Sequence, residues 1–406
     1  MRVLHTADWH LGKKLEQYER TEEQQDFLDW LIETLNTERI DVLIVSGDIF
    51  DSGSPSNTAL GQYYSFLRKV KDTCCREVII TGGNHDSIST LNAPRELLKY
   101  FNIHIVGGVP DIFTEQIIPI KDAGGKIELV VCAVPFLRDK DIRLSIAGES
   151  AEEREIRIKQ GIADHYHRFT AHIALYKEAG IPVIATGHLF AAGAGSSDSE
   201  KEIHVGNLGQ VAGDMFPVEF DYIALGHIHR PQLVNKMNHI RYSGSPIPLS
   251  FSESDNKKQV ILLDFEAGVL TSIREYLVPA ARKLLRIRGN LETVKTRLLV
   301  LEDAQLKYPA WVEIQLETEA FIPDLEEQLN ALKQDKPFIE HLFLRQIRVV
   351  PAAVLKQQAA EALELVDLNP KEVFLKKCEA TFGDTDYSEL ITTYEEVLEH
   401  MTQKED

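Results

Sequence analysis

The chain has 406 residues, of which 44% are hydrophobic and 26% are charged, and its formal net charge is -19. These values describe a globular chain long enough for two or three domains. No apolar stretch approaches the roughly 18 residues of a membrane-spanning helix, and the chain passes from Met1 directly into its first apolar run, which leaves no room for a signal peptide. The four cysteines lack Cys-x-x-Cys spacing and are expected to be reduced. We therefore expect a cytoplasmic protein with no membrane association.

Five short apolar runs, rich in β-branched residues, each end abruptly in polar residues. In chain order they are residues 3–7 before Asp8-Trp9-His10, 42–46 before Gly47-Asp48, 78–81 before Gly82-Gly83-Asn84-His85-Asp86, 183–186 before Gly187-His188, and 222–225 before Gly226-His227-Ile228-His229. Buried strands read as continuous runs of this kind. In open α/β sheets the ligand site lies beyond the carboxyl ends of the strands, so the five polar clusters are expected to converge.

The converging side chains would be oxygen and imidazole ligands without a thiolate: Asp8, His10, Asp48, Asn84, His188, His227 and His229. Seven ligands are too many for one tetrahedral zinc but suit two five- or six-coordinate ions. A carboxylate can bridge, so Asp48 is the expected shared ligand between ions roughly 3.5 to 4 Å apart. Each cluster alone is explained as well by a turn or an ordinary buried histidine. The five clusters together predict a two-metal site.

Five motifs resemble those of the calcineurin-like metallophosphoesterases: Asp8-x-His10, Gly47-Asp48-x-x-Asp51, Gly83-Asn84-His85-Asp86, Gly187-His188 and Gly226-His227-x-His229. Longer runs at residues 5–12, 47–53, 223–230 and 242–251 resemble the bacterial SbcD nuclease subunits, closely over residues 1–275 and more loosely beyond. The resemblance implies an α/β fold, namely a metallophosphoesterase β-sandwich with flanking helices, then a small α/β capping domain and C-terminal helices. It also implies a manganese-dependent DNA exonuclease and endonuclease, a homodimer within a heterotetramer, that works with the ATPase SbcC in processing DNA ends and hairpins.

Mapped by motif, one Mn²⁺ would take Asp8, His10, Asp48 and His229, and the other Asp48, Asn84, His188 and His227; Mg²⁺ and other divalent ions stay chemically possible. His85 would face the phosphate and protonate or stabilise the departing sugar oxygen. Asp51 has two explanations of equal weight. Its carboxylate orients His85, as in related phosphatases, or it only forms a turn in the loop that follows.

The chain divides into three segments: a nuclease domain at residues 1–275, a DNA-capping domain at 276–350 and a tail at 351–406. The second segment shows a βαβαβ pattern. In the tail, a linker precedes two helices, which begin near residues 369 and 386 and carry apolar residues at helical spacing. The resemblance implies that this pair docks onto the SbcC ATPase. The alternative is that the helices fold back onto the core of this chain.

A net charge of -19 opposes DNA binding, although the tail contributes thirteen acidic residues against five basic ones. Residues 281–299 hold six basic residues and one acid, so this segment either contacts DNA phosphates or is a solvated strand and helix face. Two other functions stay open. One is a phosphatase or small-molecule phosphodiesterase of the same fold, although the phosphatase pattern has arginine where this chain has Ser52. The other is a non-catalytic DNA-repair scaffold, which would not need the full ligand set.

Overall fold

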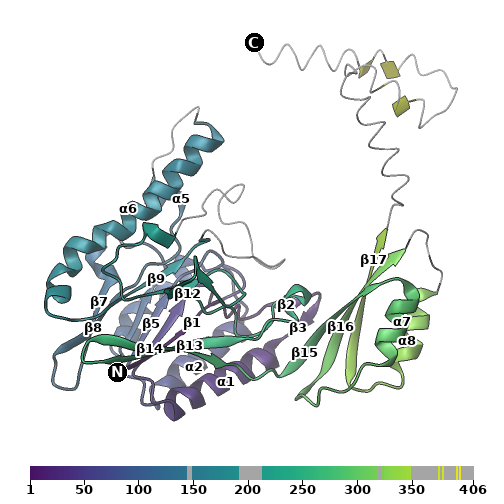
Figure 1. Ribbon diagram of the computed structural model, residues 1–406, viewed down its shortest axis with the longest axis horizontal. Coiled ribbons are helices and arrows are strands. Elements are labelled where there is room, and N and C mark those ends of the chain that lie inside the picture. The colour runs from purple at the N-terminus through teal and green to yellow at the C-terminus, as the bar shows by residue number, and fades with distance from the viewer. Residues whose placement is uncertain are drawn as a thin grey trace.

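The computed structural model describes residues 1–143, 149–191, 213–318, 322, 324–348, 374, 377–378, 390–391 and 393–394. Two six-stranded sheets pack face to face, with helices on both outer sides, and a smaller three-stranded sheet follows (Figure 1). Among the described residues, none of the helices has the length and apolar character to cross a membrane. The predicted α/β sandwich with flanking helices is confirmed.

The first sheet has the strand order β14-β13-β1-β4-β5-β6. Its strands are β1 (Arg2–Thr6), β4 (Val42–Ser46), β5 (Glu77–Thr81), β6 (Ile103–Val106), β13 (Gln259–Glu266) and β14 (Val269–Leu277). β1, β4, β5 and β6 run parallel, while β13 pairs antiparallel with β1 and β14. Side chains alternate between the faces of a strand, so Leu4 packs among residues of the outer helices and Val3 packs toward the second sheet. Burial on both faces explains why these strands are apolar throughout.

The second sheet has the order β11-β12-β10-β9-β8-β7. Its strands are β7 (Ile117–Lys121), β8 (Ile127–Cys132), β9 (Val183–His188), β10 (Tyr222–Gly226), β11 (Gln232–Val234) and β12 (Met237–Tyr242). The four inner strands are parallel and the two edge strands pair antiparallel. Between the sheets, Val42 and Ile44 of the first meet Ile184 and Ala224 of the second in one buried cluster. This layer aligns the carboxyl ends of β1, β4, β9 and β10.

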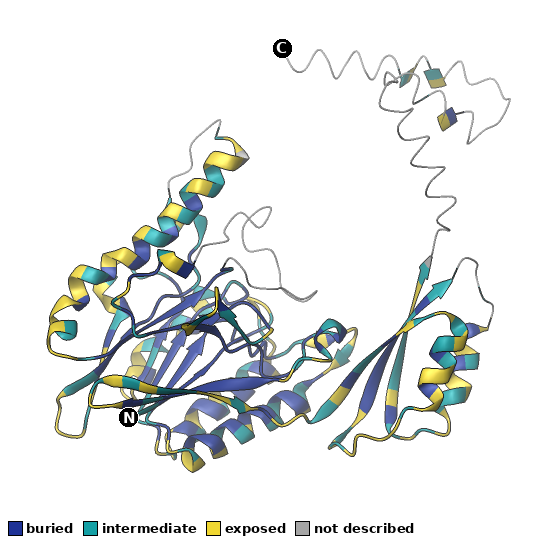
Figure 2. Cartoon of the chain, viewed as in Figure 1, coloured by how far each residue is buried: buried dark blue, intermediate teal, exposed yellow. Residues whose placement is uncertain are grey.

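Helices α1 (Thr21–Thr37) and α2 (Asn57–Val70) cover the outer face of the first sheet, and α6 (Ala151–Glu178) covers that of the second. The long α6 begins with a capping box between Ser150 and Glu153. Its buried Ile158, Ile162 and Phe169 recur at helical spacing against the second sheet. Figure 2 shows the result, with buried strands inside and helices that are buried on one side only.

The third sheet is built from β15 (Arg282–Gly289), β16 (Tyr308–Thr318) and β17 (Ile339–Arg348), all parallel, with α7 (Leu291–Leu299) and α8 (Leu325–Lys333) between them in the chain. Both helices pack on one face of this sheet. The other face meets the sandwich, where Leu284 and Trp311 of the sheet form a buried cluster with Leu15 and Phe251. Leu15 belongs to a short hairpin that comes soon after His10.

The remaining short elements lie in the loops of the sandwich. They are the hairpin strands β2 (Lys14–Leu15) and β3 (Tyr18–Glu19), the helices α3 (Ile88–Asn92), α4 (Arg95–Lys99) and α5 (Asp139–Ile142), and the 3-10 turns η1 (Phe113–Gln116), η3 (Gly213–Met215) and η4 (Phe251–Glu253). Most of the tail at 351–406, with its expected linker and helix pair, lies outside the described residues. Within it, the rings of Phe374 and Tyr394 stack with their centroids 4.1 Å apart.

Candidate metal centre

The ends of five strands supply all the predicted site residues. β1 leads to Asp8 and His10, β4 to Asp48 and Asp51, β5 to Asn84 and His85, β9 to His188, and β10 to His227 and His229. The two sheets contribute jointly, because β1, β4 and β5 belong to the first and β9 and β10 to the second. The site therefore lies where the carboxyl ends of both sheets meet, as the sequence pattern predicted.

The backbone leaves these strands in an unusual conformation. Asp8, His10, Asp48 and His227 have φ values of 54°, 45°, 51° and 98°, a region that residues other than glycine rarely adopt. Hydrogen bonds between the first two loops hold this geometry, since the amide of Asp8 donates to the carbonyl of Gly47 at 3.0 Å and that of His10 to the carbonyl of Asp48 at 3.0 Å. Strained residues held by their surroundings are typical of functional sites.

Two glycines allow the loops to approach one another. A Cβ atom at Gly83 would collide with the amide and carboxylate of Asp48, and one at Gly226 would collide with the carbonyl oxygen of Ser46. The same Gly226 Cβ would lie 2.9 Å from Nδ1 of His188. Both positions need glycine because the neighbouring strands' ligand-bearing loops occupy the space of a side chain.

Asp8, His10 and His229 form the first ligand group, with one ligand atom from each lying within 4.8 Å of the others. All three are buried. Among the described residues, Asp8 Oδ2 is buried without a hydrogen-bond partner, and the two ring nitrogens of His10 have only carboxylate oxygens of Asp48 and Asp51 nearby, at 3.4 and 3.3 Å. Buried polar atoms are nearly always satisfied, so this group fits a bound cation.

Asn84, His188 and His227 also lie close together and form a second candidate ligand group. Nε2 of His188 is 2.9 Å from Oδ1 of Asn84, and Nδ1 of His227 is 3.2 Å from the same oxygen. Nδ1 of His188 lies 3.0 Å from the carbonyl oxygen of Ser46, which can only accept. A proton on Nδ1 leaves the Nε2 lone pair for a metal, the arrangement usual for metal-binding histidines.

Asp48 stands between the two groups. Its Oδ2 is 3.4 Å from Nε2 of His10 and 3.3 Å from Nε2 of His188. Its Oδ1 accepts a hydrogen bond from the amide of His85 at 2.9 Å. One oxygen within reach of a ligand from each group is the geometry that a bridging carboxylate requires.

His85 and Asp51 meet through the main chain. Nδ1 of His85 is 2.7 Å from the carbonyl oxygen of Asp51. The Asp51 carboxylate instead lies 3.3 Å from Nδ1 of His10 and 3.0 Å from the ammonium of Lys13. Asp51 thus contacts His85 with its backbone and His10 with its side chain, a division that the sequence does not reveal.

Comparisons with known proteins agree with this geometry. A model of the calcineurin-like phosphoesterase family matches residues 1–231, and one described as the type 5 capsule protein repressor C-terminal domain matches residues 280–382. The SbcD subunit of nuclease SbcCD from Escherichia coli (strain K12) is 38% identical over 378 residues, covering 93% of this chain and 92% of its own length. The chain belongs to the SbcD family of calcineurin-like phosphoesterases.

Other members of the SbcD family are also similar. The SbcD subunit from Bacillus subtilis (strain 168) is 33% identical over 78% of this chain and 79% of that protein, and the one from Rhodobacter capsulatus is 35% identical over 71% of each. The predicted family resemblance is confirmed, and with it the metallophosphoesterase fold. The chain is a hydrolase that depends on divalent metal.

Charges in the site are strongly coupled. Burial raises the pKa of Asp8 to about 7. Burial would lower the pKa of His188, but the carboxylates of Asp48 and Asp8 outweigh it and raise that pKa to about 9. Burial also opposes ionisation of Asp48, yet His188 and His10 hold its pKa well below its usual range. Imidazolium cannot bind a metal, so protons and divalent cations compete for the same atoms.

Two acidic residues support the site without having been predicted. Asp86 is buried and accepts from the amides of Ile49, Phe50 and Gly83 at 3.1, 3.0 and 2.9 Å, which ties the loop after β4 to the loop after β5. Glu253 is buried with an oxygen 3.4 Å from Nδ1 of His229. Asp86 belongs to the motif Gly83-Asn84-His85-Asp86, so the sequence did indicate a role for it. Glu253 lies beyond the run at 242–251 that resembles the family, so nothing in the sequence indicated a role for it.

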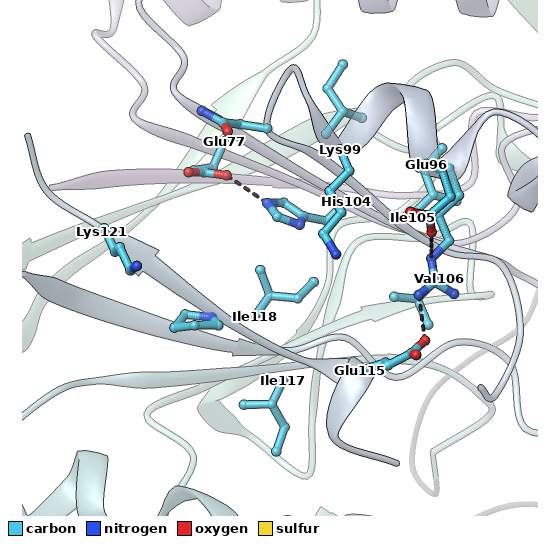
Figure 3. A pocket seen from close by; sticks show the side chains of 14 residues that line it. Glu77, Glu96, Lys99, His104, Ile105, Val106, Glu115, Ile117, Ile118 and Lys121 are labelled. Carbon is cyan, nitrogen blue, oxygen red and sulfur yellow. Dashed lines mark hydrogen bonds and ion pairs between the residues drawn. The ribbon is translucent and has the colours of Figure 1, made fainter. Parts of the chain in front are cut away.

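A polar cavity of about 610 Å³ lies apart from these residues, between β6, β7 and α4 (Figure 3). Its lining contains a Glu77–His104 contact of 2.8 Å and an Arg95–Glu115 pair of 2.5 Å. It contains none of the predicted site residues. Four of its charged or titratable side chains are paired in this way, which is the pattern of a solvated surface groove rather than of a metal site.

Proposed function

We propose that this chain is a two-metal DNA nuclease subunit, which hydrolyses DNA phosphodiesters in the processing of DNA ends, in repair and in recombination. One observation carries the proposal: the carboxylate of Asp48 lies within 3.4 Å of His10 and 3.3 Å of His188, which belong to two separate groups of candidate oxygen and imidazole ligands. Relatives across most of the chain are named as nuclease subunits, which supports DNA as the substrate over a phosphoprotein or small phosphodiester. Since DNA is the proposed substrate, we also propose that the protein works in the cytoplasm.

The proposed ligands divide as the two groups do. Asp8, His10 and His229 would hold one ion, Asn84, His188 and His227 the other, with Asp48 shared by both. Two dications held there would supply a nucleophile at neutral pH and neutralise charge that develops on the phosphate. Oxygen and imidazole ligands without thiolate favour manganese, which we propose as the metal, with magnesium as an alternative.

His85 is the proposed general acid. Its Nδ1–H donates to the carbonyl of Asp51, so the ring is held with its second nitrogen, Nε2, directed away from that loop. From that position Nε2 could pass a proton to the departing sugar oxygen. Asp51 is then a positioning residue for His85 through its carbonyl and for His10 through its carboxylate.

Residues 276–350 are the proposed DNA-capping domain. Their sheet packs against the hairpin that follows His10, which brings it beside the metal centre. The basic segment at 281–299 is only partly available to DNA, because Arg282, Arg286 and Arg288 form ion pairs with Glu23, Glu313 and Glu317. Those three arginines are engaged within the chain, so phosphate contacts would come from other cations.

An SbcC-like ATPase is the proposed partner, and residues 351–406 its proposed docking segment. The relatives are named as components of a nuclease, SbcCD, whose name implies a second component, SbcC, beside SbcD. The stacked rings of Phe374 and Tyr394 support two tail segments that pack on each other. Deletion of the tail distinguishes docking onto the ATPase from packing onto the core of this chain.

A homodimer within a heterotetramer is the proposed assembly. Large apolar side chains gather around α4, where Leu97, Tyr100 and Phe101 are 63%, 87% and 43% exposed. Lys71, at the end of α2, lies over the Phe101 ring at 4.6 Å, which places the end of α2 beside this patch. An exposed patch of this kind favours self-association. Sedimentation velocity of the wild type and of Leu97→Asp tests it, and a wild-type monomer at micromolar concentration would contradict the proposal.

The decisive assay is digestion of an end-labelled DNA duplex with and without the SbcC-like ATPase, in Mn²⁺, in Mg²⁺ and in chelator. We expect cleavage with Mn²⁺ that ATP and the partner stimulate, and none in chelator. Asp48→Ala is the inactive control, because it removes the one carboxylate that faces both ions, so its bound metal should also fall. Hydrolysis of phosphomonoesters with an intact duplex would indicate a phosphatase instead, and no hydrolysis of either would indicate a scaffold.

A further inference from the structure

Glu253 ends the short turn η4 and is completely buried. Its Oε1 lies 3.4 Å from Nδ1 of His229. Its Oε2 accepts from the ammonium of Lys258 at 2.5 Å and from the amide of Leu249 at 3.2 Å. The carboxylate therefore contacts both a proposed metal ligand, His229, and a buried cation, Lys258.

The main chain of His229 is held by the same network. Its carbonyl oxygen accepts from the ammonium of Lys258 at 3.0 Å and from the amide of Ser245 at 3.1 Å. The hydroxyl of Ser245 in turn accepts from Lys258 at 2.8 Å. Both the backbone and the ring of His229 are thus fixed by Glu253, Lys258 and Ser245, none of which is a proposed ligand.

Burying the Glu253–Lys258 ion pair costs free energy because both charges lose their hydration, so the pair is expected to have a role that offsets this cost. The contact between Glu253 and His229 indicates that role. A carboxylate can only accept a hydrogen bond, so Nδ1 of His229 carries the proton and donates it to Glu253. The lone pair of the ring is then on Nε2, where it is available to a metal ion bound together with Asp8 and His10. Carboxylates behind metal-binding histidines fix the ring and raise its basicity in this way.

We propose that Glu253, charged and held in place by Lys258, is a positioning residue that fixes His229 for binding one of the two metal ions. The turn that carries it is anchored at its other end, where Phe251 packs against Leu284 and Trp311 of the three-stranded sheet and its ring lies 5.4 Å from that of Phe343. The turn that positions His229 thus also takes part in the contact between the sandwich and the third sheet. This inference rests on the proposed two-metal function.

The test is manganese binding by the full-length chain, measured by titration calorimetry on the wild type, Glu253→Gln and Glu313→Gln. Glu313 is the matched control, because it is also a buried carboxylate in an ion pair, with Arg286, but it lies in the third sheet. We expect Glu253→Gln to weaken one of two binding events about 10- to 100-fold and to leave the other unchanged. Glu313→Gln should bind both ions as the wild type does. A parallel duplex-cleavage assay should show that excess Mn²⁺ restores much of the turnover of Glu253→Gln.

Unchanged affinity in Glu253→Gln, or equal weakening in both variants, would overturn the positioning role. Loss of both ions in Glu253→Gln alone would overturn it as well, since the contact is with one ligand group only. The wild type could bind two ions, and Glu253→Gln could weaken the binding of one of them, while the wild type cuts no DNA. In that case the proposed substrate is wrong and the positioning role stands. A wild type that binds no manganese refutes both.

Discussion

The ring of His85 owes its orientation to a main-chain atom. The carbonyl of Asp51 lies 2.7 Å from its Nδ1, while the neighbouring Asn84 turns its oxygen toward His188 and His227. Two consecutive residues of one loop thus have different contacts, and we propose that they serve different tasks, Asn84 in binding a metal ion and His85 in contacting the substrate. The division predicts that the two tasks can be separated by substitution.

In His85→Asn, metal binding should survive while turnover falls. Proton donation by a general acid contributes roughly 10² to 10⁴-fold, or about 3 to 5 kcal/mol of barrier, and the ligand groups keep all their members. Metal content by mass spectrometry and kcat on end-labelled duplex DNA with Mn²⁺ measure the two effects, because the departing sugar oxygen of DNA needs a proton. Loss of metal together with turnover would show that His85 is itself a ligand.

Asp51→Asn should be milder than His85→Asn in turnover, because the carbonyl that holds His85 is unchanged. The substitution does remove the charge that lies between His10 and Lys13, so manganese affinity should fall instead. The same two measurements compare the variants. A kcat loss as large as that of His85→Asn with normal metal affinity would assign the orienting role to the carboxylate.

The sequence predicted which residues converge but not which atoms they use. Asp8, His10 and Asp48 were predictable because each follows an apolar run, and parallel strands deliver their ends to one edge. The contact of Asp51 with His85 was not, because a carbonyl group is common to every residue. Glu253 was missed because nothing in the local sequence indicates which buried ring it will face.

At the scale of elements, close approach of strand ends shapes the site. β10 and β4 belong to different sheets, yet Gly226 at the end of β10 leaves no room for a Cβ against the carbonyl of Ser46 at the end of β4. The two sheets must therefore come together at this point before the ligands on either side can meet. Close packing of the two sheets at this point is therefore required for the candidate metal ligands to lie close together.

Gly226→Ala should lower the free energy of unfolding by about 1 to 3 kcal/mol, the usual cost of overpacking a buried site. Gly61→Ala is the matched control, because Gly61 lies in α2 with open space around its Cβ position, where alanine should stabilise by about 0.4 to 1 kcal/mol. Urea unfolding of each variant provides the comparison. Equal stability of the two variants would refute the close-approach argument.

Element types were more predictable than element boundaries. The apolar run at 42–46 is β4 without change, since both of its faces are buried and its ends are marked by Asp41 and Gly47. In the third sheet, pairing with Ala310 of β16 sets the start of β17 at Ile339. α8 begins at Leu325, after Asp324 with φ of 54°. Pairing partners and single backbone angles are not visible in a local pattern.

At the scale of the whole molecule, several arginines in the part of the chain that the structure describes are paired with carboxylates. Arg282 contacts Glu23 of α1 from the start of β15, so one of the expected DNA-binding cations joins the two sheet systems instead. Its guanidinium also lies over the Trp311 ring at 4.4 Å. Affinity for DNA in a chain of net charge -19 must then depend on the assembly as a whole, including the proposed partner.

Deletion of residues 366–406 tests how that assembly forms. Several large apolar side chains on a helix pair, at roughly 1.5 to 3 kcal/mol each on full burial, can drive docking, and the segment contains none of the proposed ligands. We expect the truncated protein to hydrolyse bis-p-nitrophenyl phosphate with Mn²⁺ as the wild type does, but not to co-purify with the SbcC-like ATPase.

Leu390, 46% exposed, offers a point variant, and Leu390→Asp should weaken partner binding without unfolding the chain. Unfolding on truncation, or intact partner binding, would mean that the tail packs onto this chain's own core.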